Sequence, residues 1–150
     1  MSGALRIRPA QPADRAALIA IYARATLDEL AHEPVIPALI PLPEDRTRLA
    51  ALDASEVVVA CTARVLGFGA RTTGRITMLF VDPAARGAGI GSTLLTHMLD
   101  GMPGAVELDV VASNAAALAL YRRAGFVHGE RGRAVYNGVA VDVLRLRRPG

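Results

Sequence analysis

The chain lacks several residue types that particular functions need. It has 150 residues and a single cysteine, Cys61, so an internal disulfide cannot form. Aromatic residues make up 4% of the sequence, too few for a surface on which nucleic-acid bases stack. No apolar run approaches the length of a membrane span. We therefore expect neither a disulfide scaffold, nor a nucleic-acid-binding protein, nor a membrane protein.

Lysine is also absent, and all 17 basic residues are arginine. Against 14 acidic residues they leave a net charge of only +3. This small positive charge favours attraction of a polyanionic ligand. The arginines are scattered and do not form the basic stripe that nucleic-acid binding needs. Residues 1–9 have a strand pattern in place of a charged and apolar leader, which predicts a cytoplasmic protein.

The most informative segment connects an apolar run at residues 76–81 to a helical pattern that starts near Ser92. Between them, after Asp82-Pro83, stands the sequence Arg86-Gly87-Ala88-Gly89-Ile90-Gly91. Glycine has no Cβ and lets a ligand approach the backbone, and the first amides of a helix have no acceptor inside it. A strand, a glycine loop and a helix in this order predict a pyrophosphate cradle.

Spacing excludes two common phosphate-binding loops. A Walker A loop contains Gly-Lys-Ser/Thr, and this chain has no lysine. The dinucleotide motif Gly-x-Gly-x-x-Gly fails because Ser92 stands where the third glycine would be. The remaining pattern, Arg-x-x-Gly-x-Gly after a strand, resembles the acyl-CoA loop of the Gcn5-related N-acetyltransferase (GNAT) superfamily.

A second motif follows the strand-like run at residues 106–111. It reads Asn114-Ala115-Ala116-Ala117-Leu118-Ala119-Leu120-Tyr121-Arg122-Arg123-Ala124-Gly125-Phe126. Asn114 suits a helix N-cap, Tyr121 lies two helical turns later on the same face, and Gly125 suits the helix end. The segment is similar to the later GNAT signature Asn-x-x-Ala-x-x-Leu-Tyr-x-Arg/Lys-x-Gly-Phe at every defined position.

This resemblance covers nearly the whole chain and implies one domain, residues 1–150, with a mixed α/β (α+β) fold. Its mostly antiparallel sheet has about six to seven strands, and the fourth and fifth, residues 76–81 and 106–111, are parallel and splayed. The other expected elements follow from local patterns. They are strands at 5–9, 57–60, 65–70, 126–130 and 135–146, a helix from Asp14 as N-cap to about Leu30, an irregular segment at 33–43, a helix at 44–52, and a bend at Asn137-Gly138.

The resemblance also implies acetyl-CoA as co-substrate, with no metal. Backbone groups of the fourth strand hold the pantetheine arm, and the glycine loop and the second motif bind the rest. The expected binding residues are Leu79, Phe80, Val81, Arg86, Gly87, Ala88, Gly89, Ile90, Gly91, Ser92, Asn114, Ala117, Tyr121 and Arg123.

In the implied mechanism an amine attacks the thioester directly, so Cys61 is not needed as a nucleophile. A backbone N–H near Leu79 polarises the carbonyl, and Tyr121 is the general acid. A phenol with a pKa of about 10 is protonated at neutral pH and can donate to a thiolate whose conjugate acid has a pKa of about 8.5. No other potential metal ligands accompany His97 and His128 at metal-binding spacing in the sequence.

The general base is not fixed by the motifs. Many family members carry a glutamate on the fourth strand, where this chain has Arg75, Thr77 and Met78. Glu29 is the leading candidate because it lies on the helical stripe of Tyr22 and Ala25. The alternatives are Asp28, His32, Glu33, Glu107, Asp109 and a chain of water molecules.

The predicted activity is transfer of an acetyl group from acetyl-CoA to a primary amine of a small molecule, an amino acid or a peptide. One alternative is an acyl-CoA-binding or acyl-CoA-sensing module that is weak or inactive as a catalyst. Another is an unrelated α/β protein that binds ATP or NAD with its glycine loop. The family's acceptor side corresponds to residues 25–43 and 131–140, and similar proteins often pair as homodimers through terminal strands.

Overall fold

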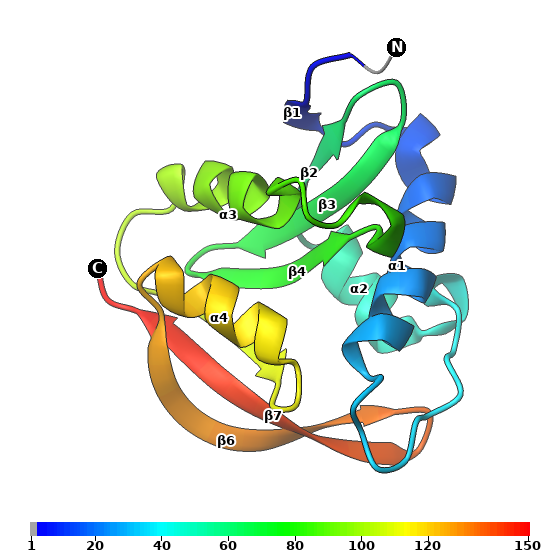
Figure 1. Cartoon of the computed structure of the whole chain (residues 1–150), viewed down its shortest axis with the longest axis vertical. Helices are drawn as coiled ribbons and strands as arrows, with labels where there is room; N and C mark the ends of the chain where they lie inside the picture. Colours follow the sequence, from blue (N-terminus) through cyan, green and yellow to red (C-terminus); the bar gives the residue numbers. More distant parts are fainter. Residues whose placement is uncertain (1–2) are drawn as a thin grey trace.

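A computed structural model describes residues 3–150, which form a seven-stranded sheet in the order β1-β2-β3-β4-β5-β7-β6 (Figure 1). The strands are β1 (Arg6–Pro9), β2 (Glu56–Cys61), β3 (Val65–Thr72), β4 (Arg75–Val81), β5 (Val106–Val111), β6 (Val127–Tyr136) and β7 (Val139–Arg148). The helices are α1 (Arg15–Glu29), α2 (Arg46–Asp53), α3 (Ile90–Asp100) and α4 (Ala115–Arg123). None of the helices in this part of the chain is long and apolar enough to cross a membrane.

The helices cover both faces of the sheet, because alternate strand residues point to opposite faces. Val58 and Ala60 of β2 pack in the cluster that contains the buried residues of α3 and α4. Val59, between them, packs with the buried residues of α1 and α2. The sheet therefore separates two apolar layers, with α3 and α4 over one face and α1 and α2 over the other (Figure 1).

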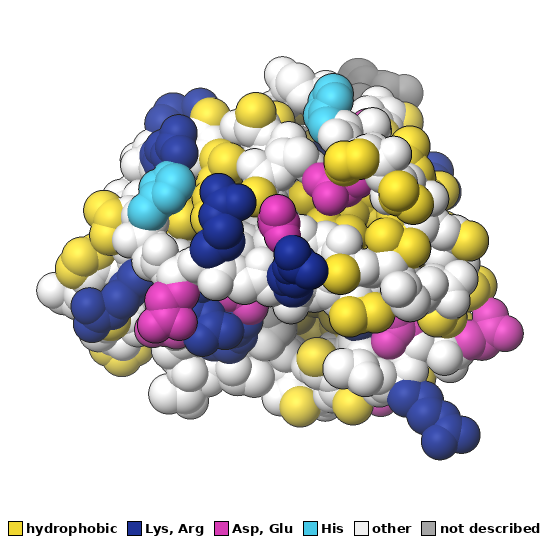
Figure 2. Space-filling model, turned by 90° about the horizontal axis from the view of Figure 1, so that it is seen from below, with side chains coloured by type: hydrophobic (Ala, Val, Ile, Leu, Met, Phe, Trp, Pro, Cys, Tyr) yellow, Lys and Arg dark blue, Asp and Glu magenta, His cyan; other side chains and the backbone are white. Residues whose placement is uncertain are grey.

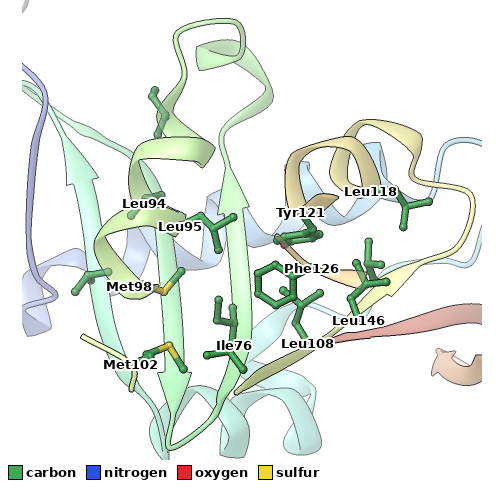
Figure 3. Packing of buried hydrophobic residues seen from close by; sticks show 14 of the residues in the cluster. Ile76, Leu94, Leu95, Met98, Met102, Leu108, Leu118, Tyr121, Phe126 and Leu146 are labelled. Carbon is green, nitrogen blue, oxygen red and sulfur yellow. The ribbon is translucent and has the colours of Figure 1, made fainter. Parts of the chain in front are cut away.

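The aromatic ring of Tyr121 lies in the layer formed by α3 and α4. Tyr121 and Phe126 lie next to each other between these helices (Figure 3), with ring centroids 5.7 Å apart in an edge-to-face arrangement. Gly125 ends α4 with a φ of +97°. The amides of Gly125 and Phe126 donate to the carbonyls of Arg122 and Tyr121, which closes the helix in a Schellman arrangement. This ending fixes where the Tyr121 ring packs.

β4 and β5 separate almost at once. They are parallel, and within residues 3–150 their pairing has a single register, Arg75 with Glu107. On its other edge β4 pairs with β3 as far as Val81, with a bulge that leaves Thr77 out of register. The predicted mixed fold with splayed fourth and fifth strands is therefore confirmed, and β4 beyond its first residues has a backbone edge without a strand partner on the β5 side.

Element positions agree with the sequence predictions except at the last hairpin. The predicted boundary between the strands at 126–130 and 135–146 is wrong, because Val135 and Tyr136 belong to β6 and β7 begins at Val139. Asn137 and Gly138 have φ values of +47° and +81°, the conformation of a two-residue hairpin turn. The turn therefore reverses the chain directly after Tyr136. At the other end, the strand pattern at residues 1–9 becomes a strand only over Arg6–Pro9, and Met1 and Ser2 lie outside the described residues.

Asp14 precedes α1 as predicted, but its side chain does not cap the helix. The carboxylate accepts hydrogen bonds from Arg8 at 2.8 Å and 3.0 Å and from the Gln11 amide at 2.7 Å. The prediction of a side-chain N-cap is therefore wrong, because a charged partner on β1 holds the carboxylate. Asp14 instead ties the end of β1 to the start of α1.

Asp82 anchors the loop that follows β4. Its side chain is 2% exposed and accepts hydrogen bonds from Arg24 of α1 at 2.8 Å and 3.3 Å, from Arg64 at 3.3 Å, and from the Ala84 amide at 3.1 Å. The hydrogen bond from Arg24, supported by those from Ala84 and Arg64, holds the pKa of Asp82 below its usual value despite burial. One buried carboxylate thus connects the loop, α1 and the β2–β3 turn.

We predict that Asp82→Asn lowers the free energy of unfolding at pH 7 by about 2 kcal/mol, because charge-assisted hydrogen bonds are lost. An acid with a lowered folded-state pKa stabilises the fold above its unfolded pKa, here 3.8, and loses that effect as pH falls through the folded value. The difference between variant and wild type should therefore shrink below pH 3.8 in urea titrations. Asp53→Asn, which removes the exposed partner of Arg15, is the control and should cost less than about 0.5 kcal/mol.

Candidate functional site

A cavity of about 280 Å³ opens where β4 separates from β5. Three segments form its wall: the second half of β4, the glycine loop with the first turn of α3, and the inner face of α4. The lining residues are Ala25, Glu29, Leu79, Phe80, Val81, Ala85, Arg86, Gly87, Gly89, Ile90, Gly91, Ser92, Asn114, Ala116, Ala117, Leu120, Tyr121 and Arg123. We call this space the first cavity.

The glycine loop gives the first cavity a rim of backbone amides. Gly87 and Gly89 have φ values of +85° and +73°, which residues with a side chain rarely adopt. Gly89 occupies the N-cap position of α3 and supplies no side-chain cap. The first amides of α3, those of Ile90, Gly91 and Ser92, therefore lack acceptors within the helix and are available to an anion.

The first cavity also combines a free strand edge with positive charge. Leu79, Phe80 and Val81 of β4 line it along the edge that β5 leaves unpaired. Arg86 and Arg123 line it from the glycine loop and from α4. The Arg86 guanidinium, 46% exposed, forms an ion pair with Asp28 at the end of α1. Backbone donors and two guanidinium groups around one cleft suit a long ligand that has amide groups at one end and phosphates at the other.

All the predicted binding residues except Ala88 line the first cavity. Four further lining residues were not among the predicted binding residues: Ala25, Ala85, Ala116 and Leu120. Helical spacing contained a signal for two of them: Ala25 is four residues before Glu29, and Leu120 is three residues after Ala117. Ala85 and Ala116 gave no comparable signal.

Asn114 caps α4 and borders the first cavity at once. Its side-chain oxygen accepts a hydrogen bond from the Ala117 amide at 3.2 Å, as the sequence predicted for an N-cap. The side-chain NH₂ group remains a potential donor to a ligand. Since Asn114, Ala117 and Tyr121 all line the cavity, α4 presents one continuous face to it.

A second cavity of about 290 Å³ lies on the α1 and α2 side of β4. Its wall combines residues of α1, α2, β4, β5, β6 and β7, including Tyr22, Thr26, Thr47, Arg48, Ala51, Arg75, Thr77, Met78, Asp109, Arg133, Ala134 and Tyr136. None of the described residues that line the second cavity comes from segment 31–43. Residues of α2 line it instead, which the sequence did not predict. Of the predicted acceptor side, residues 25–43 and 131–140, the members that line this cavity are Thr26 and Glu29 of α1 and Arg133, Ala134 and Tyr136 of β6.

The two cavities meet at a shared group of residues. Six side chains line both: Glu29, Leu79, Phe80, Asn114, Ala117 and Tyr121. Only Glu29 and Tyr121 among them carry an ionisable group. The structure therefore brings together the two residues that the sequence proposed as base and acid, which are 92 positions apart in the numbering, at the boundary between the cavities.

The carboxyl group of Glu29 has a strongly altered acidity. Burial raises its pKa from 4.5 to about 7, and the opposing effects of Tyr136, Arg48 and Arg86 are smaller. The Tyr136 hydroxyl donates a long hydrogen bond of 3.5 Å to Oε1 of Glu29. A carboxylate with a pKa near neutrality can both accept and release a proton at physiological pH.

The phenol of Tyr121 is shifted away from ionisation. Burial, with a smaller contribution from the nearby Glu29, raises the pKa of Tyr121 above its ordinary value of 10.0. Its side chain is 7% exposed. Tyr121 therefore stays protonated at neutral pH and can act only as a proton donor until a partner accepts its proton.

Most other candidate bases are held in other contacts. Asp28 is paired with Arg86, and Glu33 accepts a hydrogen bond from Ser113. Asp109 lines the second cavity, but hydrogen bonds from Arg145 and Arg75 outweigh partial burial and lower its pKa.

His32 and Glu107 are not in the wall of either cavity. Glu29 is thus the candidate whose position and acidity both suit proton transfer.

Pairing of arginine with carboxylates extends over the surface. Figure 2 shows arginine and acidic side chains mixed on one face of the molecule. Arg145 and Arg75 both contact Asp109, at 3.1 Å and 2.6 Å. Arg131 and Arg133 approach Asp142 less closely, at 3.8 Å and 3.5 Å. Positive charge is therefore largely compensated locally.

Comparison with known proteins gives a family match. A sequence profile described as the acetyltransferase (GNAT) family matches residues 13–126, more than half of the chain. The N-alpha-acetyltransferase RimI of Mycobacterium tuberculosis is 45% identical over 69 residues, a match that covers 45% of this chain and 44% of that protein. The peptidyl-lysine N-acetyltransferase YjaB of Salmonella typhimurium is 33% identical over 129 residues, covering 81% of this chain and 83% of that protein.

Solved structures share the fold. An acetyltransferase from Salmonella typhimurium, determined with its cofactor acetyl-CoA, superimposes with a TM-score of 0.71 at 24% identity. The match covers 98% of this chain and 94% of that one. At this identity the likeness concerns the arrangement of helices and strands.

The raised pKa of Glu29 generates a stability prediction. An acid whose folded-state pKa is raised contributes stability that is complete below its unfolded pKa, 4.5, and is lost as pH rises through about 7. Glutamine has no such loss, so Glu29→Gln should become more stable than wild type by about 3 kcal/mol above pH 7. Urea unfolding at intervals from pH 4 to pH 8.5 measures the difference. Exposed Glu44→Gln is the control, and a pH-independent difference for Glu29→Gln would contradict the assignment.

Proposed function

Because the chain belongs to the acetyltransferase (GNAT) family, we propose that it transfers an acetyl group from acetyl-CoA directly to a primary amine. The observation that carries this proposal is the junction of two cavities at Glu29 and Tyr121. In the proposed reaction, the first cavity holds the acetyl donor and the second cavity admits the amine. The two substrates meet where one group can accept a proton and the other can donate one.

The first cavity fits acetyl-CoA in shape and charge. In the proposed complex, the amides of Ile90, Gly91 and Ser92 bind the diphosphate, with Arg86 and Arg123 nearby. A Cβ added at Gly91 would lie 3.5 Å from Leu120 and 3.6 Å from Val81, two residues that line the cleft. The free edge of β4 at Leu79, Phe80 and Val81 offers backbone groups to the amides of the pantetheine arm.

Acetyl-CoA supplies the thioester whose carbonyl carbon is attacked. The backbone near Leu79 donates a hydrogen bond to the carbonyl oxygen in this proposal. As the new C–N bond forms, Glu29 accepts the proton that the amine loses, directly or through water. As the C–S bond breaks, Tyr121 donates its proton to the departing sulfur and is reprotonated from solvent. The products are an N-acetylated amine and free CoA.

Catalytic turnover distinguishes this proposal from a CoA-binding module. A sensor binds acetyl-CoA but shows no amine-dependent release of free thiol. An ATP- or NAD-binding protein binds nucleotides that lack the pantetheine arm. The relatives named above are an N-alpha-acetyltransferase and a peptidyl-lysine N-acetyltransferase. The panel of amines in this turnover assay should therefore include α-amines and lysine side-chain amines. A cytoplasmic location, one-domain organisation and homodimer formation stay predictions from the sequence.

Filling the glycine cradle should weaken binding of the acetyl donor. Gly91→Val places a branched side chain between Leu120 and Val81 and should weaken the Kd for acetyl-CoA at least tenfold, about 1.4 kcal/mol. Gly91 is a sharper probe than Gly89, where a positive φ also strains any side chain. Calorimetric titration measures the affinity, and thermal unfolding confirms that the variant folds. Gly3→Val, in open space, is the control, and an unchanged Kd for Gly91→Val would contradict the proposed binding mode.

Removing the Tyr121 hydroxyl should slow the reaction without displacing acetyl-CoA. Tyr121→Phe keeps the ring against Phe126 and should lower kcat by roughly 10²-fold or more, the usual contribution of a general acid. The Kd for acetyl-CoA should change less than about twofold, because the hydroxyl acts on the departing sulfur rather than on binding. Thiol release with the best amine of the panel gives kcat. Wild-type turnover in the phenylalanine variant would exclude Tyr121 as the acid.

A further inference from the structure

The second cavity has more charge in its wall than proton transfer requires. Glu29 and Asp109 supply negative charge, and Arg48, Arg75 and Arg133 supply positive charge. A cavity that admitted only an uncharged or cationic amine would gain nothing from guanidinium groups. The positive residues therefore bear on which acceptor fits.

Arg75 is accounted for within the wall. Its Nη2 lies 2.6 Å from Asp109, which also accepts from Arg145 at 3.1 Å. Arg133 is 74% exposed and only 3.5 Å from Asp142. An ion pair this exposed contributes little, so Arg133 is a weak anchor. Arg48 is the remaining cation, and it differs from both.

Arg48 is held firmly at the edge of the second cavity. Its side chain is 24% exposed, and Nη1 lies 3.0 Å from Asp45. Nη2 donates to the carbonyl of Val135 at 3.2 Å. The guanidinium carbon stands 4.0 Å from the centre of the Tyr136 ring, a cation–π contact. Three neighbours thus fix the plane of the guanidinium before any ligand arrives.

These contacts leave binding capacity on Arg48. A guanidinium has five N–H donors in a rigid fork, and the hydrogen bonds to Asp45 and Val135 use only part of them. A preorganised fork is the arrangement that binds a carboxylate with two parallel hydrogen bonds.

Tyr136 places this positive group opposite the proposed base. Its ring lies under Arg48, and its hydroxyl donates to Glu29 at 3.5 Å. One tyrosine side chain therefore separates a guanidinium from the carboxylate that faces the amine. A molecule that carries both an amine and an acid can place each group beside its opposite charge.

We infer that the acceptor is an amino acid, or a closely similar molecule, whose free carboxylate binds Arg48 while its amine faces Glu29. This inference rests on the proposed acetyl transfer and narrows its acceptor. The size of the second cavity, about 290 Å³, suits one such molecule. Apolar wall residues such as Met78, Phe80 and Val143 favour an apolar side chain.

A peptide N-terminus is a poorer match. In a peptide the first residue has an amide where the free amino acid has a carboxylate, so the charge opposite Arg48 is missing. The pair leucine and leucinamide differs in this group alone. The amide resembles a peptide terminus, whose amine has a pKa of about 7.7–8.0 and is more often neutral at pH 8. The larger fraction of neutral amine therefore favours reaction of leucinamide, so a preference for leucine cannot result from amine basicity.

The test compares kcat/KM for L-leucine, L-leucinamide and 3-methylbutylamine with acetyl-CoA at pH 8. Wild-type enzyme should prefer leucine over leucinamide at least tenfold. Arg48→Gln should reduce the rate with leucine at least tenfold and change the rate with leucinamide less than threefold, so the preference disappears. Arg48→Lys, which keeps the charge but not the fork, should fall between them. Arg15→Gln, an exposed ion-pair residue outside both cavities, should behave as wild type.

Several outcomes overturn the inference while leaving acetyl transfer intact. One is equal turnover of leucine and leucinamide by the wild type, a result that needs no variant to fold. Another is a carboxylate preference that survives in Arg48→Gln but is lost in Arg133→Gln, which would move the anchor to β6. A structural role of Arg48 would lower thermal stability and slow all three amines equally.

Failure of the proposed function has a different signature. It would appear as no thiol release with any amine of the panel. The carboxylate site is then tested by ligand binding without turnover. The measurement is the rise in melting temperature that leucine causes, compared with the rise that leucinamide causes. A rise in wild type that is absent in Arg48→Gln supports the site, and no rise in wild type overturns it.

Discussion

The early separation of β4 from β5 is the constraint on which the rest of the site depends. Parallel strands that stayed paired would satisfy each other's backbone groups and close the space between them. Here the pairing ends after Arg75 and Glu107, while β3 holds the other edge of β4 and β7 holds β5 along its length. The two strands can therefore part without unravelling, and both cavities occupy the region next to the gap.

The C-terminal end of α1 connects the parts of this site. Arg24 reaches the buried carboxylate of Asp82 and fixes the loop after β4. One turn later Asp28 pairs with Arg86 of the same loop, and Glu29 lies at the cavity junction. A single helix thus positions the proposed base and neutralises Arg86, the cation of the glycine loop. The last turn of α1 therefore contacts the glycine loop through Asp28 and lines both cavities through Glu29.

Local patterns explain why so much was predictable. Asn114 as N-cap, Gly125 as helix end and the glycine loop before α3 depend on neighbours within a few residues, so the sequence contains their causes. Where a distant charge competes, the local rule fails. Asp14 stands at the N-cap position but turns to Arg8. The division of the last hairpin failed for a local reason, because the backbone conformation of Asn137-Gly138 defines a turn rather than a bend within a strand.

By itself the sequence determined the family, the order of elements and the residues of the glycine loop, because each of these follows from short-range spacing. Only the tertiary structure decided the acidity of Glu29 and the composition of the second cavity. The contact between Tyr136 and Glu29 joins residues 107 positions apart, and Arg48 reaches Val135 over 87 positions. Burial and ion pairing of this kind arise when separate elements pack together, and no local pattern encodes which side chains will then share a space.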